Sequence, residues 1–400
     1  MEIKGQYATA VCYAKDIEPV AVAQIQLLCD QAFAEGSRIR IMPDVHAGKG
    51  CTIGTTMTIQ EKAVPNLVGV DIGCGMYAVR LDRKCIDFAV LDEVCHWIPS
   101  GQNLWEIPQA SFALEELHCF HKLRRRNKLQ CALGTLGGGN HFIEVDRAED
   151  GSLWLVIHSG SRNLGKQVCE YYQQLAVDIA EGKEDYHRAA PALIAKLKAE
   201  GREKEIQKQL DDLRIQCNHK TVPDSLCPLE GSHLSDYLHD VKICQAFAAL
   251  NRETMASLIL ARTGLTALES FHTVHNYIDT EEMILRKGAI AAHAGERVLI
   301  PINMREGSII AIGRGSSEWN HSAPHGAGRI MSRKEARASL SLEAYRDAMK
   351  GIYTTTVSLE TIDEAPMAYK RLEDITDVIR ESVDIVEIIQ PVYNFKAAEK

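Results

Sequence analysis

Residues that could bind a metal ion recur next to glycines along this chain, at the ends of apolar runs. The clearest case is VGVDIGCGMYAVR, which places Asp71 and Cys74 three residues apart at the predicted end of a buried strand. Imidazole, thiolate and carboxylate groups together suit Mn, Fe, Co or Zn, because the ion lowers the cost of burying the negative charges. A thiolate has lone pairs to spare, so Cys74 could bridge two ions.

Five further segments share this composition, although they lie far apart in the sequence. They are MPDVHAGKG with Asp44 and His46, GTLGGGNHFIEV with Asn140, His141 and Glu144, IHSGSR with His158 and Arg162, HTVHNY with His275 and Asn276, and HSAPHGAGR with His321, His325 and Arg329. Taken singly, such a histidine is more often structural than a ligand, Asp71 could cap a turn, and Cys74 could pack as a small apolar residue. Because glycine lets the backbone approach a ligand closely, the repetition favours one convergent site.

Two glycine-rich turns, GTLGGGN (134–140) and HGAGR (325–329), are candidate phosphate-binding concavities. Exposed backbone N–H groups in such turns bind anions. Neither turn matches the Walker pattern GxxxxGK[ST] or the dinucleotide pattern GxGxxG. The residues alone therefore favour metal-assisted phosphate chemistry and leave the reaction open.

The elements that must position these residues alternate between strand-rich and helical blocks. The first third reads as short strands broken by tight turns, and residues 165–262 have helical periodicity and heavy charge. Short strands return over 288–315, and we expect helices over 332–353 and 372–395. No linker divides the blocks, so we predict one large α+β domain over residues 1–400 with a central helical insertion.

Bulk properties are those of a globular protein that is neither exported nor inserted in a membrane. The net charge of −9 argues against nonspecific coating of nucleic acid, although the run Lys122–Lys128 could line a local basic groove or form a solvated face. No apolar stretch is long enough to span a membrane, and the N-terminus is too polar for a signal peptide. Twelve scattered cysteines fit reduced thiols, so we expect a cytoplasmic location.

Taken together, these segments resemble the RtcB family of RNA ligases over residues 42 to about 396. The matching blocks are MPDVHAGKGCTIG, VGVDIGCGM, GTLGGGNHFIEV, HSGSRNLG, HNY, RKGAIAAHAGE, HGAGRIMSR and DEAPMAYK. The resemblance implies an enzyme dependent on GTP and two Mn²⁺ ions. It would join RNA ends bearing a 2′,3′-cyclic phosphate or 3′-phosphate to 5′-hydroxyl ends, in RNA repair or tRNA splicing, through a guanylated histidine and an RNA 3′-guanylate.

The resemblance also implies roles for individual residues. His325 matches the guanylated histidine, and five residues match the ligands of the two ions, with Cys74 bridging: Asp71, Cys74, His141, His158 and His275. The expected nucleotide-binding residues are Asn140, Glu144, Asn276, Asn303, Ser308, Ala327, Gly328, Tyr369 and Lys396. Glu144 would accept hydrogen bonds from guanine, Lys396 would contact that base and Tyr369 would stack on it. The expected RNA-binding residues are His46, Arg162 and Arg333.

The chain also departs from the family pattern in ways that concern the substrate. Asn303 stands in place of a serine near the nucleotide, and Arg305 and Glu306 enlarge that loop. His321 could make a new contact or lie on the surface, and we expect the surface position. These departures suggest a paralogous bacterial subgroup whose RNA substrate could be damaged ribosomal or transfer RNA. The alternatives are a metal-dependent cyclic phosphodiesterase that does not ligate, and a noncatalytic RNA-binding subunit. Family analogy adds a possible archease-like activator as partner.

Overall fold

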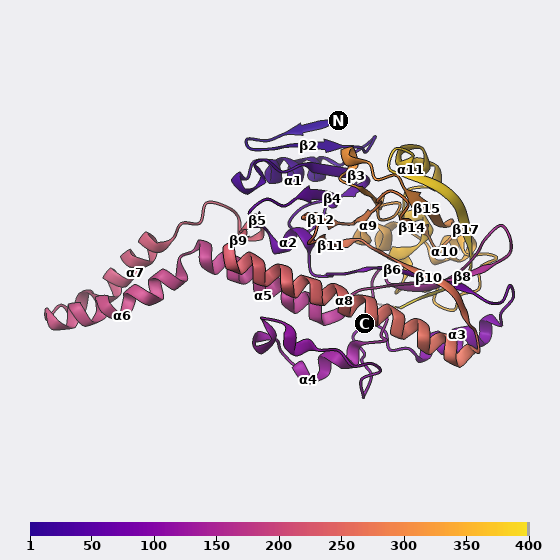
Figure 1. The fold of residues 1–400 in the computed structure, drawn as a ribbon, viewed down its shortest axis with the longest axis horizontal. Coiled ribbons are helices and arrows are strands. Elements are labelled where there is room, and N and C mark those ends of the chain that lie inside the picture. The colour runs from indigo at the N-terminus through magenta and orange to yellow at the C-terminus, as the bar shows by residue number, and fades with distance from the viewer. Residues whose placement is uncertain (398–400) are drawn as a thin grey trace.

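Two antiparallel-rich β-sheets form the centre of the computed structural model, which describes residues 1–397 (Figure 1). The smaller, six-stranded sheet has the order β1 (Glu2–Lys4), β2 (Thr9–Cys12), β3 (Ile39–His46), β4 (Ile53–Thr58), β12 (Ile284–Lys287) and β11 (Asn276–Asp279). The larger, seven-stranded sheet has the order β10 (Ala267–Val274), β6 (Gly75–Leu81), β8 (Leu153–Ser159), β7 (Phe142–Arg147), β17 (Val383–Lys396), β15 (Gly307–Gly313) and β14 (Arg297–Asn303). Two short pairs complete the strands: β13 (Ala289–Ala291) with β16 (Ser322–Pro324), and β5 (Lys62–Ala63) with β9 (Leu229–Glu230).

Strand β8 is buried along its whole length, and its first five residues are apolar because both faces of the sheet are covered there. Leu155 and Ile157 belong to a core that includes Met255 of helix α8 (Gly231–Thr263). On the opposite face, Trp154 and Val156 pack with residues of β14 and β15. Since successive side chains of a strand point to opposite faces, this two-sided packing explains the unbroken run LWLVI.

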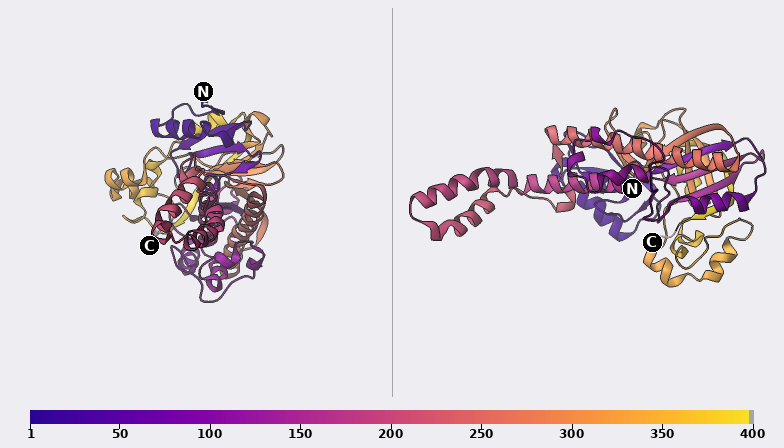
Figure 2. Two further views of the ribbon diagram at one scale, coloured as in Figure 1. Left: turned by 90° about the vertical axis from the view of Figure 1, so that its left-hand side faces the viewer. Right: turned by 90° about the horizontal axis from the view of Figure 1, so that it is seen from below.

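The expected helical insertion is present. It comprises α5 (Arg162–Ala180), α6 (Lys183–Ala199), α7 (Ile206–Cys217) and α8 (Gly231–Thr263). Helices α5 and α8 pack side by side against the body, whereas α6 and α7 form a hairpin that projects away from it (Figures 1 and 2). The mixed architecture confirms the α+β prediction.

The remaining α-helices lie around the sheets, and one C-terminal segment corrects the sequence prediction. These helices are α1 (Pro19–Cys29), α2 (Pro65–Val68), α3 (Phe88–Trp97), α4 (Arg126–Leu129), α9 (Arg333–Ser339), α10 (Leu342–Ala348) and α11 (Leu372–Ile379). The helix expected over 372–395 ends at Ile379, and Val383–Lys396 is strand β17. This segment is rich in β-branched residues and pairs with both β15 and β7, so sheet pairing prevails over its charged, helix-like spacing.

Candidate metal and nucleotide site

Two groups of potential metal ligands share Cys74. One consists of Asp71, Cys74 and His141, and the other of Cys74, His158 and His275; in each group the ligand atoms lie within 4.8 Å of one another. The Cys74 Sγ lies 3.4 Å from His141 Nε2 and 3.3 Å from His158 Nε2. The structure thus brings all five expected ligands together, with the thiol in the position of a bridge.

The strand order explains why these residues meet. In the sequence of neighbours β10, β6, β8 and β7, His275 follows β10, Cys74 precedes β6, His158 lies near the end of β8 and His141 precedes β7. Antiparallel pairing brings these four positions to one edge of the sheet. The fully buried Arg252 of α8 stabilises this end of the sheet, because it donates hydrogen bonds to the carbonyl oxygens of Gly73 and Ser159, at 2.7 and 2.8 Å.

The histidine hydrogen bonds leave lone pairs directed at Cys74. Nδ1 of His141 lies 2.9 Å from the carbonyl of Leu136, and Nδ1 of His158 lies 3.0 Å from the carbonyl of Asn140. A carbonyl only accepts, so each Nδ1 carries the proton and each Nε2 presents a lone pair. Lone pairs that converge on a thiol are what a cation requires, and metal-binding histidines are oriented in this way by their other nitrogen. The donor set therefore fits transition-metal ions.

The charges of these groups follow from their burial. Burial holds the pKa of His158 and of His275 well below the ordinary value, so both imidazoles are neutral and able to act as ligands. Burial also raises the pKa of the Cys74 thiol well above its ordinary value, and Asp71 adds to this effect. A bound divalent ion would supply the charge that a thiolate needs in this position.

Asp71 adjoins His141, with its Oδ2 3.1 Å from His141 Nε2. Burial by itself raises the pKa of this carboxyl, but a proton on His141 Nε2 would outweigh burial and lower the pKa to about 2. When His141 acts as a ligand through that nitrogen, a bound metal ion would supply the positive charge instead. Gly160 makes room for the carboxylate, since a Cβ at that position would lie 2.2 Å from Asp71 Oδ1. Gly75 is constrained by the neighbouring strand and not by the site, because a Cβ at this position would collide with the backbone of Thr273 in β10.

His325 is held next to this site by a buried carboxylate. Its Nδ1 lies 2.6 Å from Oδ2 of Asp44, and its backbone N–H donates to the same oxygen at 3.2 Å. Asp44 is fully buried on β3, and the carboxylate fixes the proton on Nδ1 and leaves Nε2 free to attack. The ring of His325 packs against that of His275, with centroids 4.9 Å apart. A potential nucleophile thus adjoins the candidate metal ligands.

A cavity of about 220 Å³ opens beside His325. Seven of the expected nucleotide-binding residues line it: Asn140, Glu144, Asn303, Ala327, Gly328, Tyr369 and Lys396. His46 and Arg333, which we expected to bind RNA, line the same cavity. Asn276 and Ser308 are not among its lining residues: Asn276 accepts from Gly288 N–H at 2.9 Å, and Ser308 is fully buried.

Glu364 organises one wall of this cavity. It accepts hydrogen bonds from Lys396 Nζ at 2.8 Å and Tyr369 Oη at 2.6 Å, and it pairs with Arg333 at 3.2 Å. Burial alone would raise the pKa of this carboxyl, but Lys396 and Arg333 outweigh burial and lower it to about 2. Glu144 faces the cavity with the opposite shift, because burial raises its pKa to about 7.

Comparisons with known proteins agree with this geometry. The family model described as "tRNA-splicing ligase RtcB" matches residues 31–111 and 109–397. The chain belongs to the RtcB family. It is 33% identical to "RNA-splicing ligase RtcB" of Escherichia coli K12 over 88% of this chain and 87% of that protein. It is 27% identical to "tRNA-splicing ligase RtcB" of Archaeoglobus fulgidus, over 85% of this chain and 83% of that protein.

A second cavity, of about 790 Å³, lies on another side of the candidate metal ligands in this RtcB-family chain. Asp71 and His141 line it together with five basic side chains: Arg124, Arg125, Lys128, Arg162 and Lys166. The basic run near residue 125 therefore faces a cavity that reaches the candidate metal site. Arg162, expected to bind RNA, lies here, where its guanidinium donates to the carbonyl of Gly101 at 2.6 Å.

The structure also shows where the residues that depart from the family pattern lie. Asn303 shapes the turn between β14 and β15, because its Oδ1 accepts from the backbone N–H groups of Arg305 and Glu306 at 2.9 and 3.0 Å. Arg305 points to the carbonyl of Lys350 at 2.7 Å. His321, expected on the surface, is partly buried against Glu282.

No helix in the described part of the chain is long and apolar enough to cross a membrane.

Proposed function

We propose that this protein is a GTP-dependent RNA ligase that joins 2′,3′-cyclic phosphate or 3′-phosphate ends to 5′-hydroxyl ends. Membership of the RtcB family supports an RNA ligase role. The observation that carries the finer proposal is the position of His325. Its Nδ1 is held by buried Asp44, and its ring contacts His275 at the mouth of a cavity that contains Glu144 and Lys396.

In the first step, Nε2 of His325 attacks the α-phosphorus of GTP. An N–P bond forms, the bond from the α-phosphorus to the bridging oxygen breaks, and pyrophosphate leaves with that electron pair. The imidazole gains positive charge as the bond forms, and the Asp44 carboxylate stabilises this charge through the Nδ1–H hydrogen bond. The resulting enzyme holds a guanylate on His325.

Two Mn²⁺ ions would be held by Asp71, Cys74, His141, His158 and His275, with Cys74 shared between them. When bound, such ions polarise phosphate oxygens and stabilise the charge on the leaving group. The chain's own residues fix the donor atoms beforehand, because backbone carbonyls orient His141 and His158.

One hydrolysis and two transfers complete the reaction. The oxygen of water bonds to the phosphorus of the cyclic phosphate, the bond from phosphorus to O2′ breaks, and the 2′-oxygen takes a proton, which leaves a 3′-phosphate. An oxygen of this 3′-phosphate then attacks the guanylate phosphorus and releases the His325 nitrogen. The 5′-hydroxyl oxygen of the second RNA attacks the 3′-phosphate phosphorus, GMP leaves, and the hydroxyl proton passes to solvent. One GTP is converted to GMP and pyrophosphate for each joint.

We assign guanine recognition to the part of the 220 Å³ cavity that Glu144, Tyr369 and Lys396 line. The Glu144 carboxylate can accept from guanine N1–H and the exocyclic amine, and Asn394 positions it by donating at 2.7 Å. Lys396 can donate to the guanine carbonyl, and Tyr369 offers a ring for stacking. Glu364 anchors both Lys396 and Tyr369, so the wall is arranged before the nucleotide binds.

The RNA is assigned to the 790 Å³ cavity, which reaches the candidate metal ligands from the basic side. Arginine forms forked contacts with phosphate, and each neutralised phosphate releases counterions. RNA binding should therefore weaken steeply as salt increases. Arg162 and the basic residues near position 125 would carry this dependence.

The test is ligation of defined RNAs that end in a cyclic phosphate and a 5′-hydroxyl, with GTP and Mn²⁺. We expect joined product from the parent and from His187→Ala, an exposed histidine on α6, and none from His325→Ala. Opening of the cyclic phosphate without joining, at equal rates in all three proteins, would instead establish the phosphodiesterase alternative. Parallel stem-loops of transfer-RNA and ribosomal-RNA origin would identify the preferred substrate.

A further inference from the structure

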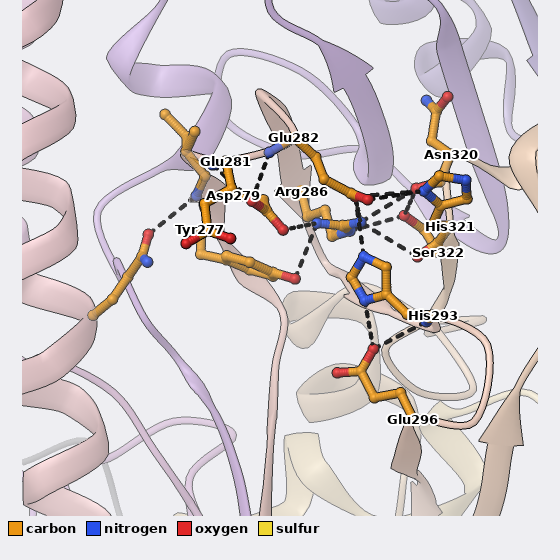
Figure 3. Close-up of polar contacts among 12 residues, drawn as sticks. Tyr277, Asp279, Glu281, Glu282, Arg286, His293, Glu296, Asn320, His321 and Ser322 are labelled. Atoms are coloured by element: carbon orange, nitrogen blue, oxygen red, sulfur yellow. Dashed lines mark hydrogen bonds and ion pairs between the residues drawn. The ribbon is translucent and has the colours of Figure 1, made fainter. Parts of the chain in front are cut away.

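A third group of potential metal ligands lies outside the site described above. It consists of Glu282, His293 and His321, whose ligand atoms all lie within 4.8 Å of one another (Figure 3). Glu282 comes from the turn between β11 and β12, His293 follows β13, and His321 precedes β16. We refer to these three residues as the 282/293/321 cluster.

The separations within this cluster match those of ligands around one ion. His293 Nε2 lies 3.0 Å from Glu282 Oε2, and His321 Nδ1 lies 3.2 Å from Glu282 Oε1. Zinc binds nitrogen and oxygen ligands at about 2.0–2.2 Å, so neighbouring ligand atoms are about 2.8–3.6 Å apart for angles between 90° and the tetrahedral value. Both contacts to Glu282 fall in this range, and the remaining pair, His293 and His321, lies within 4.8 Å and would close around the ion.

His293 lies between two carboxylates. Its Nδ1 lies 2.7 Å from Glu296 Oε2, and the same oxygen accepts its backbone N–H at 3.0 Å. Glu296 therefore orients the ring so that Nε2 faces Glu282 Oε2, 3.0 Å away. Without an ion a second proton on Nε2 bridges this contact, and a zinc ion would take the place of that proton. A carboxylate that orients a histidine in this way is typical of zinc sites.

The backbone around the cluster is held in place before any ion binds. His321 follows Asn320, and both residues have positive φ angles, +48° and +52°. The fully buried Arg286 holds this turn by donating to the carbonyl oxygens of Asn320 and His321, at 3.2 and 3.3 Å (Figure 3). Asp279 accepts the backbone N–H of Glu282 at 3.0 Å and so fixes the other turn.

We propose that Glu282, His293 and His321 bind one Zn²⁺ ion, with water in the fourth position. Two histidines and a glutamate form a known zinc ligand set, and the partial exposure of all three side chains, 30–37%, leaves access for the water. This site lacks a thiol, so its ligand chemistry differs from that of the Cys74 site. The proposal does not depend on the ligase function.

The ion would act as a positioning centre for the catalytic strands. Strand β11 begins at Asn276, directly after His275, and its far end leads to Glu282. Strand β16 (Ser322–Pro324) lies between His321, which precedes it, and His325, which follows it. Zinc at the cluster would tie the far ends of two strands whose near ends carry the nucleophile and a metal ligand.

Cobalt binding to chelator-stripped protein tests the proposal, because Co²⁺ replaces Zn²⁺ and reports its ligands by absorption. We expect the double variant His293→Gln/His321→Gln to bind one equivalent fewer per chain than the parent. The thiolate-to-cobalt charge-transfer band of the Cys74 site should be unchanged. His187→Gln, an exposed histidine on α6, is the matched control and should bind as the parent does.

Two results would overturn the proposal. The first is an equal number of bound cobalt ions in the parent and the double variant, which would make the cluster an ion-pair network only. The second is parent-like cobalt affinity in Glu282→Gln, which would contradict zinc binding by Glu282. We expect this variant to bind the additional cobalt ion at least ~10-fold more weakly than the parent. Glu282 is exposed, so this variant also tests the proposal if the double variant fails to fold. Zinc should also raise the melting temperature of the parent more than that of the double variant.

Discussion

Asp44 should set the rate at which His325 takes up the guanylate. Oδ2 of Asp44 accepts both the Nδ1–H and the backbone N–H of His325, at 2.6 and 3.2 Å, within a fully buried setting. In Asp44→Asn, the amide oxygen should keep this position, because turning the amide would direct its NH₂ group at the backbone N–H. The tautomer of His325 is then preserved, and only the negative charge is lost.

The expected magnitudes follow from the hydrogen bond that each variant removes. A hydrogen bond to a charged group contributes about 1.5–3 kcal/mol and is roughly twice as strong as a neutral one. Asp44→Asn should therefore cost about 1–1.5 kcal/mol, or a ~5–10-fold slower guanylylation, because each 1.4 kcal/mol is about tenfold. Asp44→Ala removes the bond entirely and should slow the step ~10–150-fold.

Single-turnover guanylylation with saturating GTP and Mn²⁺, followed by intact-protein mass spectrometry, measures this rate. Asp347→Asn, an exposed residue on α10, is the control and should match the parent. Thermal unfolding of each variant separates a slower reaction from a loss of folded protein. Rates that agree within twofold across parent, Asp44→Asn and Asp44→Ala would refute the role assigned to Asp44.

Three further outcomes are expected. Cys74→Ala should lose both bound Mn²⁺ equivalents in metal analysis, because its sulfur belongs to both ligand groups; retention of one full equivalent would argue against sharing. Affinity for a fluorescent guanine nucleotide should rise with increasing pH, because burial raises the pKa of the Glu144 carboxyl, which must be ionised to accept guanine N–H groups; Glu144→Gln should reduce this dependence. Glu364, with a folded-state pKa of about 2, should stabilise the protein by about 3 kcal/mol above pH ~4.5, and this stability should be lost as the pH falls toward 2. Urea unfolding of Glu364→Gln should show a shallower acid dependence, and an unchanged slope would contradict the pairing with Lys396.

A common site for the candidate metal ligands was predictable, whereas the assignment of the five residues came from the family resemblance. Polar residues near glycines at the ends of apolar runs favoured one convergent site, and Cys74 and His158 both lie near strand ends. The sheet order then brings these ends together. The sequence pattern also predicted the helical insertion, whose charged periodicity is sustained over four helices.

The pairings between these residues could not be predicted from the sequence, because they depend on contacts between distant segments. Asp44 and His325 are 281 positions apart, so their pairing follows only from the folded chain. Glu364 lies in a short turn, and its anchoring of Lys396 depends on the position of β17. That strand was mistaken for a helix for the same reason, since its partners β15 and β7 are distant in sequence.

Peptide mapping of protein incubated with GTP and Mn²⁺ shows whether His325 carries the guanylate. We expect one guanylate per chain, on His325, which is released as GMP when RNA with a 3′-phosphate end and a 5′-hydroxyl partner is added. His187→Ala should behave as the parent does. Folded, metal-loaded protein that acquires no guanylate, or an adduct that persists in His325→Ala, would contradict this expectation.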